Sequence, residues 1–113
     1  MQKKSLVWGV GMAMGLMVLA PVAVAEETVY LLTLKDHRFS PEELKIPANK
    51  KVRVVVENQD LSAEEFESFE LNREKLVAGG SKINLFIGPL KPGTYRYFGE
   101  FNAKTAQGAI VAE

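Results

Sequence analysis

The chain alternates short apolar runs with turn-forming residues along most of its length. The runs are rich in Val, Ile, Leu, Phe and Tyr, and they occupy residues 28–34, 44–46, 51–57, 65–71, 81–87, 94–98 and 108–112. Pro and Gly separate them, as at Ser40-Pro41, Gly79-Gly80 and Gly88-Pro89. Short runs with period-two alternation and frequent turns are typical of strands that pair into two packed sheets. The pattern therefore predicts an all-β fold, a β-sandwich of about seven strands.

One segment, residues 62–75, has an ambiguous pattern. Its alternation is loose, and Ser62 with Glu65 three residues later has the spacing of a helix capping box, so a helical turn is the alternative to a strand. Elsewhere the alternation selects the inward-facing side chains. The expected core positions are Leu31, Val54, Val56, Phe69, Ile83, Leu85, Tyr95, Tyr97 and Ile110.

The first 25 residues have the organisation of an export signal. Lys3 and Lys4 precede an uncharged stretch over residues 6–25, which ends in Ala23-Val24-Ala25. A basic start, an apolar middle and small residues at the cleavage positions are typical of a secretory signal peptide. The alternative is an uncleaved membrane anchor, since about 20 apolar residues span a bilayer. We expect a signal peptide at residues 1–25 and one domain at residues 26–113.

The charge balance and the sulfur content of the chain exclude several kinds of site and partner. The chain has 14 basic and 14 acidic side chains, and this neutral balance gives no electrostatic reason for a nucleic-acid partner. It has no Cys, and its four Met residues all precede the expected cleavage site. The exported domain therefore contains no sulfur, which excludes disulfides, thiolate metal sites and cysteine nucleophiles. Carboxylates and the single histidine, His37, remain as metal-binding side chains.

Several motifs, taken in order, resemble cupredoxins. Residues 39–46 (FSPEELKI) are similar to the opening of that family, residues 89–95 (PLKPGTY) to the turn before its copper loop, and residues 108–111 to its last strand. Residues 64–68 and 98–101 are similar to the periplasmic cupredoxin-like proteins associated with bacterial ferrous-iron uptake. The resemblance implies a seven-stranded Greek-key β-sandwich, a periplasmic location and a role in iron or copper handling.

The resemblance also locates the four positions that hold type 1 copper in cupredoxins. That centre uses two His, one Cys thiolate and a weak axial Met. The motifs place these ligands at Glu65, Gly99, Asn102 and Ala106 of this chain. None of the four side chains matches the ligand that it replaces. We therefore expect no type 1 copper and no blue-copper electron transfer.

A different metal site at the same end of the sandwich is the first hypothesis. Glu65 and Glu67 share strand parity, and the resemblance places Glu100 and His37 at that end as well. Carboxylate oxygen and imidazole bind iron, manganese, zinc and Cu(II). These four residues are candidate ligands of one copper or iron ion. The alternative is that His37 is a solvated loop residue and that the acidic run is a solvated face.

The second hypothesis is a metal-free docking module. Phe66 and Phe101, with Tyr97 and the surrounding Glu residues, are candidate partner-binding residues, since aromatic anchors with charged rims are frequent at interfaces. The partner would be a periplasmic or membrane component of an iron-uptake system, with membrane contact only through an uncleaved leader. A hydrolytic enzyme is disfavoured, because one His and no Cys leave no evident nucleophile and base. We expect a binding protein and not an enzyme.

Overall fold

The computed structural model describes residues 28–113. The expected signal peptide at residues 1–25 lies outside this range. Within the described range, no helix combines the length and the hydropathy that a bilayer crossing requires. The one helical element in the same range is a single 3₁₀ turn, η2 (Glu100–Asn102).

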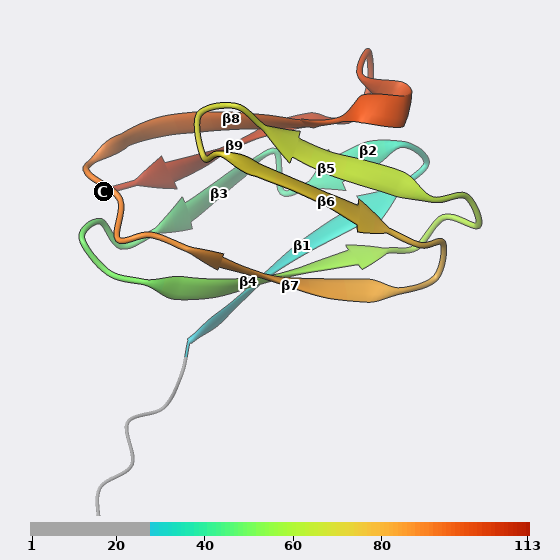
Figure 1. Cartoon of the computed structure of the whole chain (residues 1–113). Coiled ribbons are helices and arrows are strands. Elements are labelled where there is room, and N and C mark those ends of the chain that lie inside the picture. The colour runs from blue at the N-terminus through green and yellow to red at the C-terminus, as the bar shows by residue number, and fades with distance from the viewer. Residues whose placement is uncertain (1–27) are drawn as a thin grey trace, which may run out of the picture.

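Nine strands form two sheets that pack face to face (Figure 1). The first sheet has the order β2-β1-β4-β7, with bounds β1 (Val29–Lys35), β2 (Arg38–Ser40), β4 (Val52–Asn58) and β7 (Lys82–Ile87). The second has the order β3-β9-β8-β5-β6, with bounds β3 (Glu43–Ile46), β5 (Glu64–Ser68), β6 (Arg73–Val77), β8 (Gly93–Gly99) and β9 (Gln107–Ala112). Paired strands are antiparallel except β1 with β4 and β3 with β9. The predicted all-β sandwich is confirmed, with nine strands in place of seven.

The two additional strands lie where the sequence pattern is weakest. Strand β2 is three residues long and pairs with β1 through a tight turn at Asp36 and His37, whose φ angles are 51° and 58°. Strand β6 pairs with β5 over five positions, so the helical turn considered for residues 62–75 is wrong. The extended form wins because it buries Phe66 and Val77, each 1% exposed, between the sheets.

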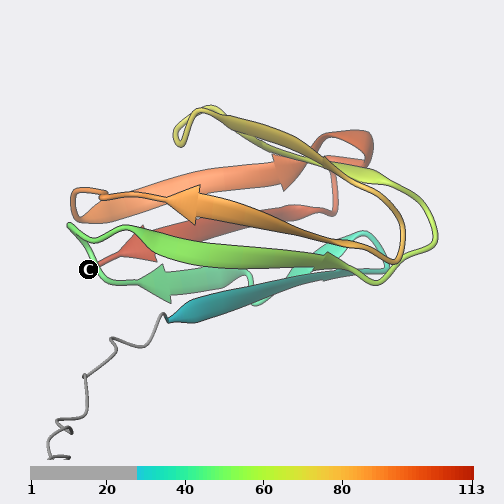
Figure 2. The same ribbon diagram turned by 60° about the horizontal axis from the view of Figure 1, so that its bottom comes forward.

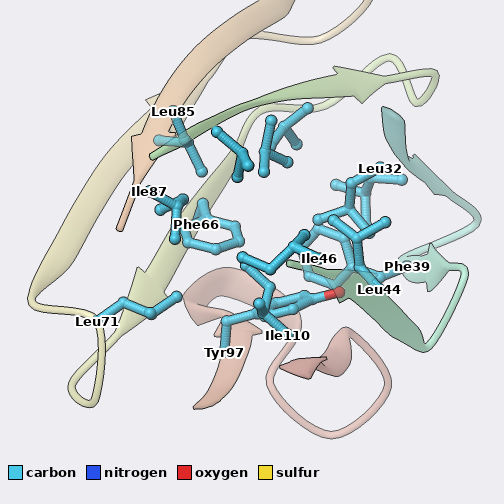
Figure 3. Close-up of a cluster of buried hydrophobic side chains, with 14 of the residues drawn as sticks. Leu32, Phe39, Leu44, Ile46, Phe66, Leu71, Leu85, Ile87, Tyr97 and Ile110 are labelled. Carbon is cyan, nitrogen blue, oxygen red and sulfur yellow. The ribbon is translucent and has the colours of Figure 1, made fainter. Parts of the chain in front are cut away.

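The core fills the space between the two sheets (Figure 3). Alternation correctly predicts five fully buried positions, which are Val54, Val56, Leu85, Tyr97 and Ile110. Two further predictions, Ile83 and Tyr95, are partly buried at the margin of this core. Packing on both sheets therefore follows the period-two pattern of the central strands.

Two expected core residues lie at the surface. Leu31 is 50% exposed because β1 turns Leu32 and Leu34 inward instead. Phe69 is 78% exposed because it belongs to the turn between β5 and β6 and not to a strand. Both errors come from strand parity and strand ends, which local composition does not determine.

Three connections gather at one end of the sandwich: the β1–β2 turn, the β4–β5 loop and η2 (Figures 1 and 2). The carboxylate of Asp60 accepts the backbone N–H groups of Asp36 at 2.7 Å and of His37 at 3.0 Å. Asn58 is 1% exposed, and its Nδ2 donates to the backbone oxygens of Ser62 at 2.9 Å and Val77 at 3.1 Å. Hydrogen bonds thus fix the loops that surround the candidate site.

Candidate functional site

Strand β5 carries carboxyl groups on both of its faces. Alternation points Glu64, Phe66 and Ser68 toward the core, where each is 1–2% exposed. Glu65 and Glu67 point to the outer face of the five-stranded sheet. Glu65 is half-buried there, and Glu67 is 8% exposed. One strand therefore separates two acidic environments.

Four carboxyl groups meet on the outer face and form what we call the outer carboxylate cluster. One oxygen from each of Glu65, Glu67, Glu74 and Glu100 lies within 4.8 Å of the others. Glu67 is directly opposite Glu74 in the β5–β6 pair. Phe66 is opposite Gly99 in the β5–β8 pair, which brings Glu100 beside Glu65. The structure thus unites the three predicted glutamates and adds Glu74.

Crowding raises the pKa of two of these carboxyls. A hydrogen bond with the Glu100 carboxyl, followed by desolvation and the charge of Glu74, raises the pKa of Glu65 from 4.5 to about 7. Desolvation, followed by the charge of Glu74, raises the pKa of Glu67. Like charges in one site oppose full ionisation. Near neutral pH the cluster therefore favours a retained proton or a bound cation.

The basic side chains that flank Glu74 do not neutralise the cluster. Arg73 donates to three backbone oxygens, including that of Phe86 at 2.9 Å. Lys75 Nζ donates to the backbone oxygen of Asn84 at 3.3 Å. Both side chains reach from β6 to β7. Within residues 28–113, no Lys or Arg forms an ion pair with the four carboxyls of the cluster.

The inner carboxyl, that of Glu64, is 2% exposed and accepts three hydrogen bonds. Its Oε1 accepts the backbone N–H of Glu65 at 2.9 Å and that of Phe101 at 2.7 Å. Its Oε2 accepts the side-chain amide of Asn102 at 2.9 Å. A buried carboxyl is tolerated when donors satisfy it in this way. Glu64 therefore joins β5 to η2.

The positions assigned to the copper ligands converge around Glu64 and not around Glu65. A Cβ on Gly99 would lie 2.6 Å from Cδ of Glu64 and 2.9 Å from Cβ of Ala106. Asn102 is hydrogen-bonded to Glu64 directly. These contacts favour Glu64, one residue before the predicted Glu65, as the side chain nearest to the other assigned positions. In a strand, a shift of one residue moves a side chain to the opposite face.

His37 shares a surface recess with η2 but is not a member of the outer carboxylate cluster. Its Nδ1 is 3.5 Å from Oδ2 of Asp60, and its side chain is 47% exposed. It lines a surface recess together with Phe101 and residues 102–105. The structure gives His37 a place in the β1–β2 turn and does not bring it to the predicted carboxylate ligands.

The two aromatic residues predicted to bind a partner have different environments. Phe66 is 1% exposed, stacks on Tyr97 at a centroid distance of 4.9 Å and meets Phe39 edge-on at 6.2 Å (Figure 3). The structure thus corrects the surface placement of Phe66, and it confirms Tyr97 as a core residue and not as part of a docking patch. Phe101 is 55% exposed on η2, next to Glu100.

Comparison with known proteins establishes the family. The chain matches the family profile of the cupredoxin-like domain over residues 9–112, and it therefore belongs to the cupredoxin-like domain family. The uncharacterized protein RP394 of Rickettsia prowazekii (strain Madrid E) is 46% identical over 80 residues, which cover 71% of this chain and 64% of that relative. The matched part thus spans less than two thirds of the relative's length.

Solved structures of cupredoxins share the fold at low sequence identity. Auracyanin A, a "blue" copper protein from Chloroflexus aurantiacus, has a TM-score of 0.65 at 12% identity, with 78% of this chain and 100% of that chain covered. Amicyanin from Paracoccus versutus has a TM-score of 0.62 at 14% identity, covering 79% and 85%. A purple cupredoxin from Nitrosopumilus maritimus has a TM-score of 0.59 at 16% identity, covering 74% and 99%. These likenesses establish the sandwich fold.

Type 1 copper does not fit this member of the family. The sequence has no Cys, and residues 28–113 have no Met. Such a centre requires a thiolate together with imidazoles. The space for a β-carbon at Gly99 is occupied by the carboxyl group of Glu64. The chain is therefore a cupredoxin-like protein without a blue-copper site.

Proposed function

We propose that this protein is an exported, periplasmic accessory in metal handling that binds a hard divalent cation on the outer carboxylate cluster. The observation that carries the proposal is the set of four carboxyls within 4.8 Å of one another without a basic partner among residues 28–113. Oxygen donors of this kind suit Mn²⁺ and similar hard ions. The role is binding and not catalysis.

The spread of the oxygens supports a single shared ion. Metal–oxygen distances for hard divalent ions are about 2.0–2.6 Å, so two oxygens on one ion lie at most about 4–5 Å apart. The four oxygens of the cluster span no more than 4.8 Å. A divalent ion would also take the place of the proton that Glu65 and Glu100 share, and binding would release that proton.

Iron is the cargo that the family resemblance favours, because residues 64–68 and 98–101 are similar to proteins associated with ferrous-iron uptake. Ferrous iron is a neighbour of Mn²⁺ in its binding preferences. The proposed ligands are the four glutamates of the cluster. His37 is left out, because it does not join them.

Calorimetric titration of the purified, chelator-treated protein with Mn²⁺, a redox-stable substitute for Fe²⁺, tests the proposal. We expect saturable binding of one ion by the wild type. Glu67→Gln removes one negative charge from the ligand set and should weaken affinity at least about tenfold, since even outer-shell changes cost that much. Glu43→Gln is the matched control: it removes one exposed carboxylate from β3 and should change affinity less than about twofold. Absence of binding by the wild type would overturn the proposal.

A metal-free docking module is the second candidate, favoured by the exposure of Phe101. This side chain is 55% exposed on η2 beside Glu100, an aromatic residue next to an acidic rim. The partner would be a periplasmic or membrane component of iron uptake. Phe101→Ser should then leave the thermal midpoint unchanged and abolish binding to that component, whereas unchanged binding would reject this candidate.

A further inference from the structure

The pairing between strands β5 and β8 is short, and side-chain hydrogen bonds extend it at both ends. Register pairing covers only Phe66↔Gly99 and Glu67↔Phe98. At one end, Ser68 Oγ donates to the backbone oxygen of Arg96 at 2.6 Å. At the other end, Glu64 joins β5 to η2 from the inner face, through the hydrogen bonds that its carboxyl group accepts from Phe101 and Asn102.

The contacts of Glu64 connect the segments that the family resemblance assigns to the copper ligands. These segments are the start of β5, the end of β8 at Gly99, and the loop that contains Asn102 and Ala106. The backbone N–H of Gly99 donates to the backbone oxygen of Ala106 at 2.8 Å, which holds the last two segments together. A ligand from each segment would meet at a metal in a copper-binding relative.

We propose that the carboxylate of Glu64 takes the place of the copper ion as the link between these segments. Its two oxygens accept hydrogen bonds from η2, at Phe101 N–H and Asn102 Nδ2, and the same carboxylate accepts Glu65 N–H. Gly99 leaves room for it, because any β-carbon at that position would collide with its carboxyl group. The domain is therefore closed at this end by its own side chain, and it folds without a metal.

The inference does not depend on the proposed cation site, because Glu64 faces the core and the cluster faces outward. Failure of Mn²⁺ to bind the cluster would leave the link intact. Conversely, the link fails if chelator treatment lowers the thermal midpoint of Glu74→Lys, a variant expected to lose the outer cation site, because a metal elsewhere would then be part of the fold. We expect this variant to have the same midpoint with and without chelator.

A double-mutant cycle tests the contact between Glu64 and Gly99. Gly99→Ala should lower the midpoint strongly in the wild type, where the new methyl meets the carboxyl, and less in a Glu64→Ala background, where only the close contact with the Ala106 side chain remains. Glu64→Ala alone should lower the midpoint by roughly 10 °C, because it leaves buried donors unpaired. Glu64→Gln, which keeps an acceptor oxygen, should recover most of this loss. Additive effects of the two alanine substitutions would overturn the inference.

Rebuilding the copper site gives a spectroscopic test of whether Glu64 occupies the copper position. A role in stability alone would not predict its result. The variant E64H/G99C/N102H/A106M supplies all four ligand types and should bind Cu(II) with an intense blue thiolate-to-copper absorption. The variant G99C/N102H/A106M retains Glu64 and should show no such absorption. Equal absorption by the two variants would show that Glu64 does not occupy the copper position.

Discussion

Glutamate side chains have opposite environments on the two faces of β5. On the inner face, Glu64 is almost fully buried and accepts three hydrogen bonds. On the outer face, Glu65 and Glu67 are crowded by Glu74 and Glu100, and one oxygen of each of the four carboxyls lies within 4.8 Å of the others. The comparison shows that burial alone does not make the position of a carboxyl group on this strand unfavourable. What matters is whether donors or other anions surround it.

A single oxygen connects the two faces. Glu64 Oε1 accepts the N–H of Glu65 and also the N–H of Phe101, the residue after Glu100. The inner carboxylate thus holds the backbone next to two members of the outer cluster. Changes to Glu64 should therefore disturb both faces, whereas changes to the cluster should leave the inner link intact. The predictions below test this asymmetry.

The largest effect is expected from Glu64→Leu. Leucine fills a similar volume but leaves the donors of Phe101 and Asn102 unpaired inside the protein, which should cost about 3 kcal/mol of unfolding free energy. Chemical denaturation measures this loss. Glu43→Leu on exposed β3 is the control and should change stability by less than about 0.5 kcal/mol. A loss below about 1 kcal/mol for Glu64→Leu would mean that the inner hydrogen bonds are unimportant.

Glu65 on the outer face should make the stability of the folded chain depend on pH. Because the pKa of Glu65 is about 7 in the folded chain, against an ordinary value of 4.5, the folded chain binds more protons than the unfolded chain between these two values. This contribution to stability is complete below pH 4.5 and is lost as the pH rises to about 7. Thermal melts in chelator should show a midpoint that falls across this window in the wild type and falls less in Glu65→Gln. Parallel pH profiles of the two proteins would contradict the shared proton.

A charge reversal at Glu74 should separate stability from cation binding. Glu74→Lys places a cation opposite Glu67 and converts a like-charge cross-strand pair into an opposite-charge pair. We expect a higher thermal midpoint for the metal-free protein and loss of Mn²⁺ binding. Glu74→Gln should give a smaller rise and weaker binding. A midpoint that falls in both variants would indicate that the carboxyls do not repel one another.

The smallest effect is expected at His37. The contact of its Nδ1 with Oδ2 of Asp60 is long, at 3.5 Å, and the imidazole is 47% exposed, so its contribution should lie within about 0.5 kcal/mol. His37→Asn retains a residue type that tolerates the positive φ of this turn. Denaturation and Mn²⁺ titration should both match the wild type. A loss of Mn²⁺ affinity of about tenfold would show that His37 is a ligand after all.

The sequence was sufficient for the fold because the fold depends on local signals. The β-branched run at 51–57 matches strand β4 to within one residue at each end, the alternation at 94–98 lies within β8, and turn residues mark most of the boundaries. Strand β2 was not predictable in this way, because three residues carry too little periodicity. Strand β6 was not predicted from the sequence because its residues are polar except for Leu76 and Val77.

The site was only partly predictable because it depends on register. Glu65, Glu67 and Glu100 were found from strand parity and the family motif. Glu74 was missed, because its position opposite Glu67 follows from the length of the β5–β6 turn. The role of Glu64 was missed because a shift of one residue along β5 exchanges its two faces. The alternation of Glu64, Phe66 and Ser68 around a core aromatic residue was the signal that identifies the inner face.

Anomalous scattering from crystals of the wild-type protein soaked in manganese chloride tests the division between the two faces most directly. We predict one manganese peak, coordinated by oxygens of Glu65, Glu67, Glu74 and Glu100, and a Glu64 carboxylate that still contacts Phe101 N–H and Asn102. No peak at the outer carboxylate cluster, or a peak bound to Glu64 and Asn102 in place of their hydrogen bond, would contradict it.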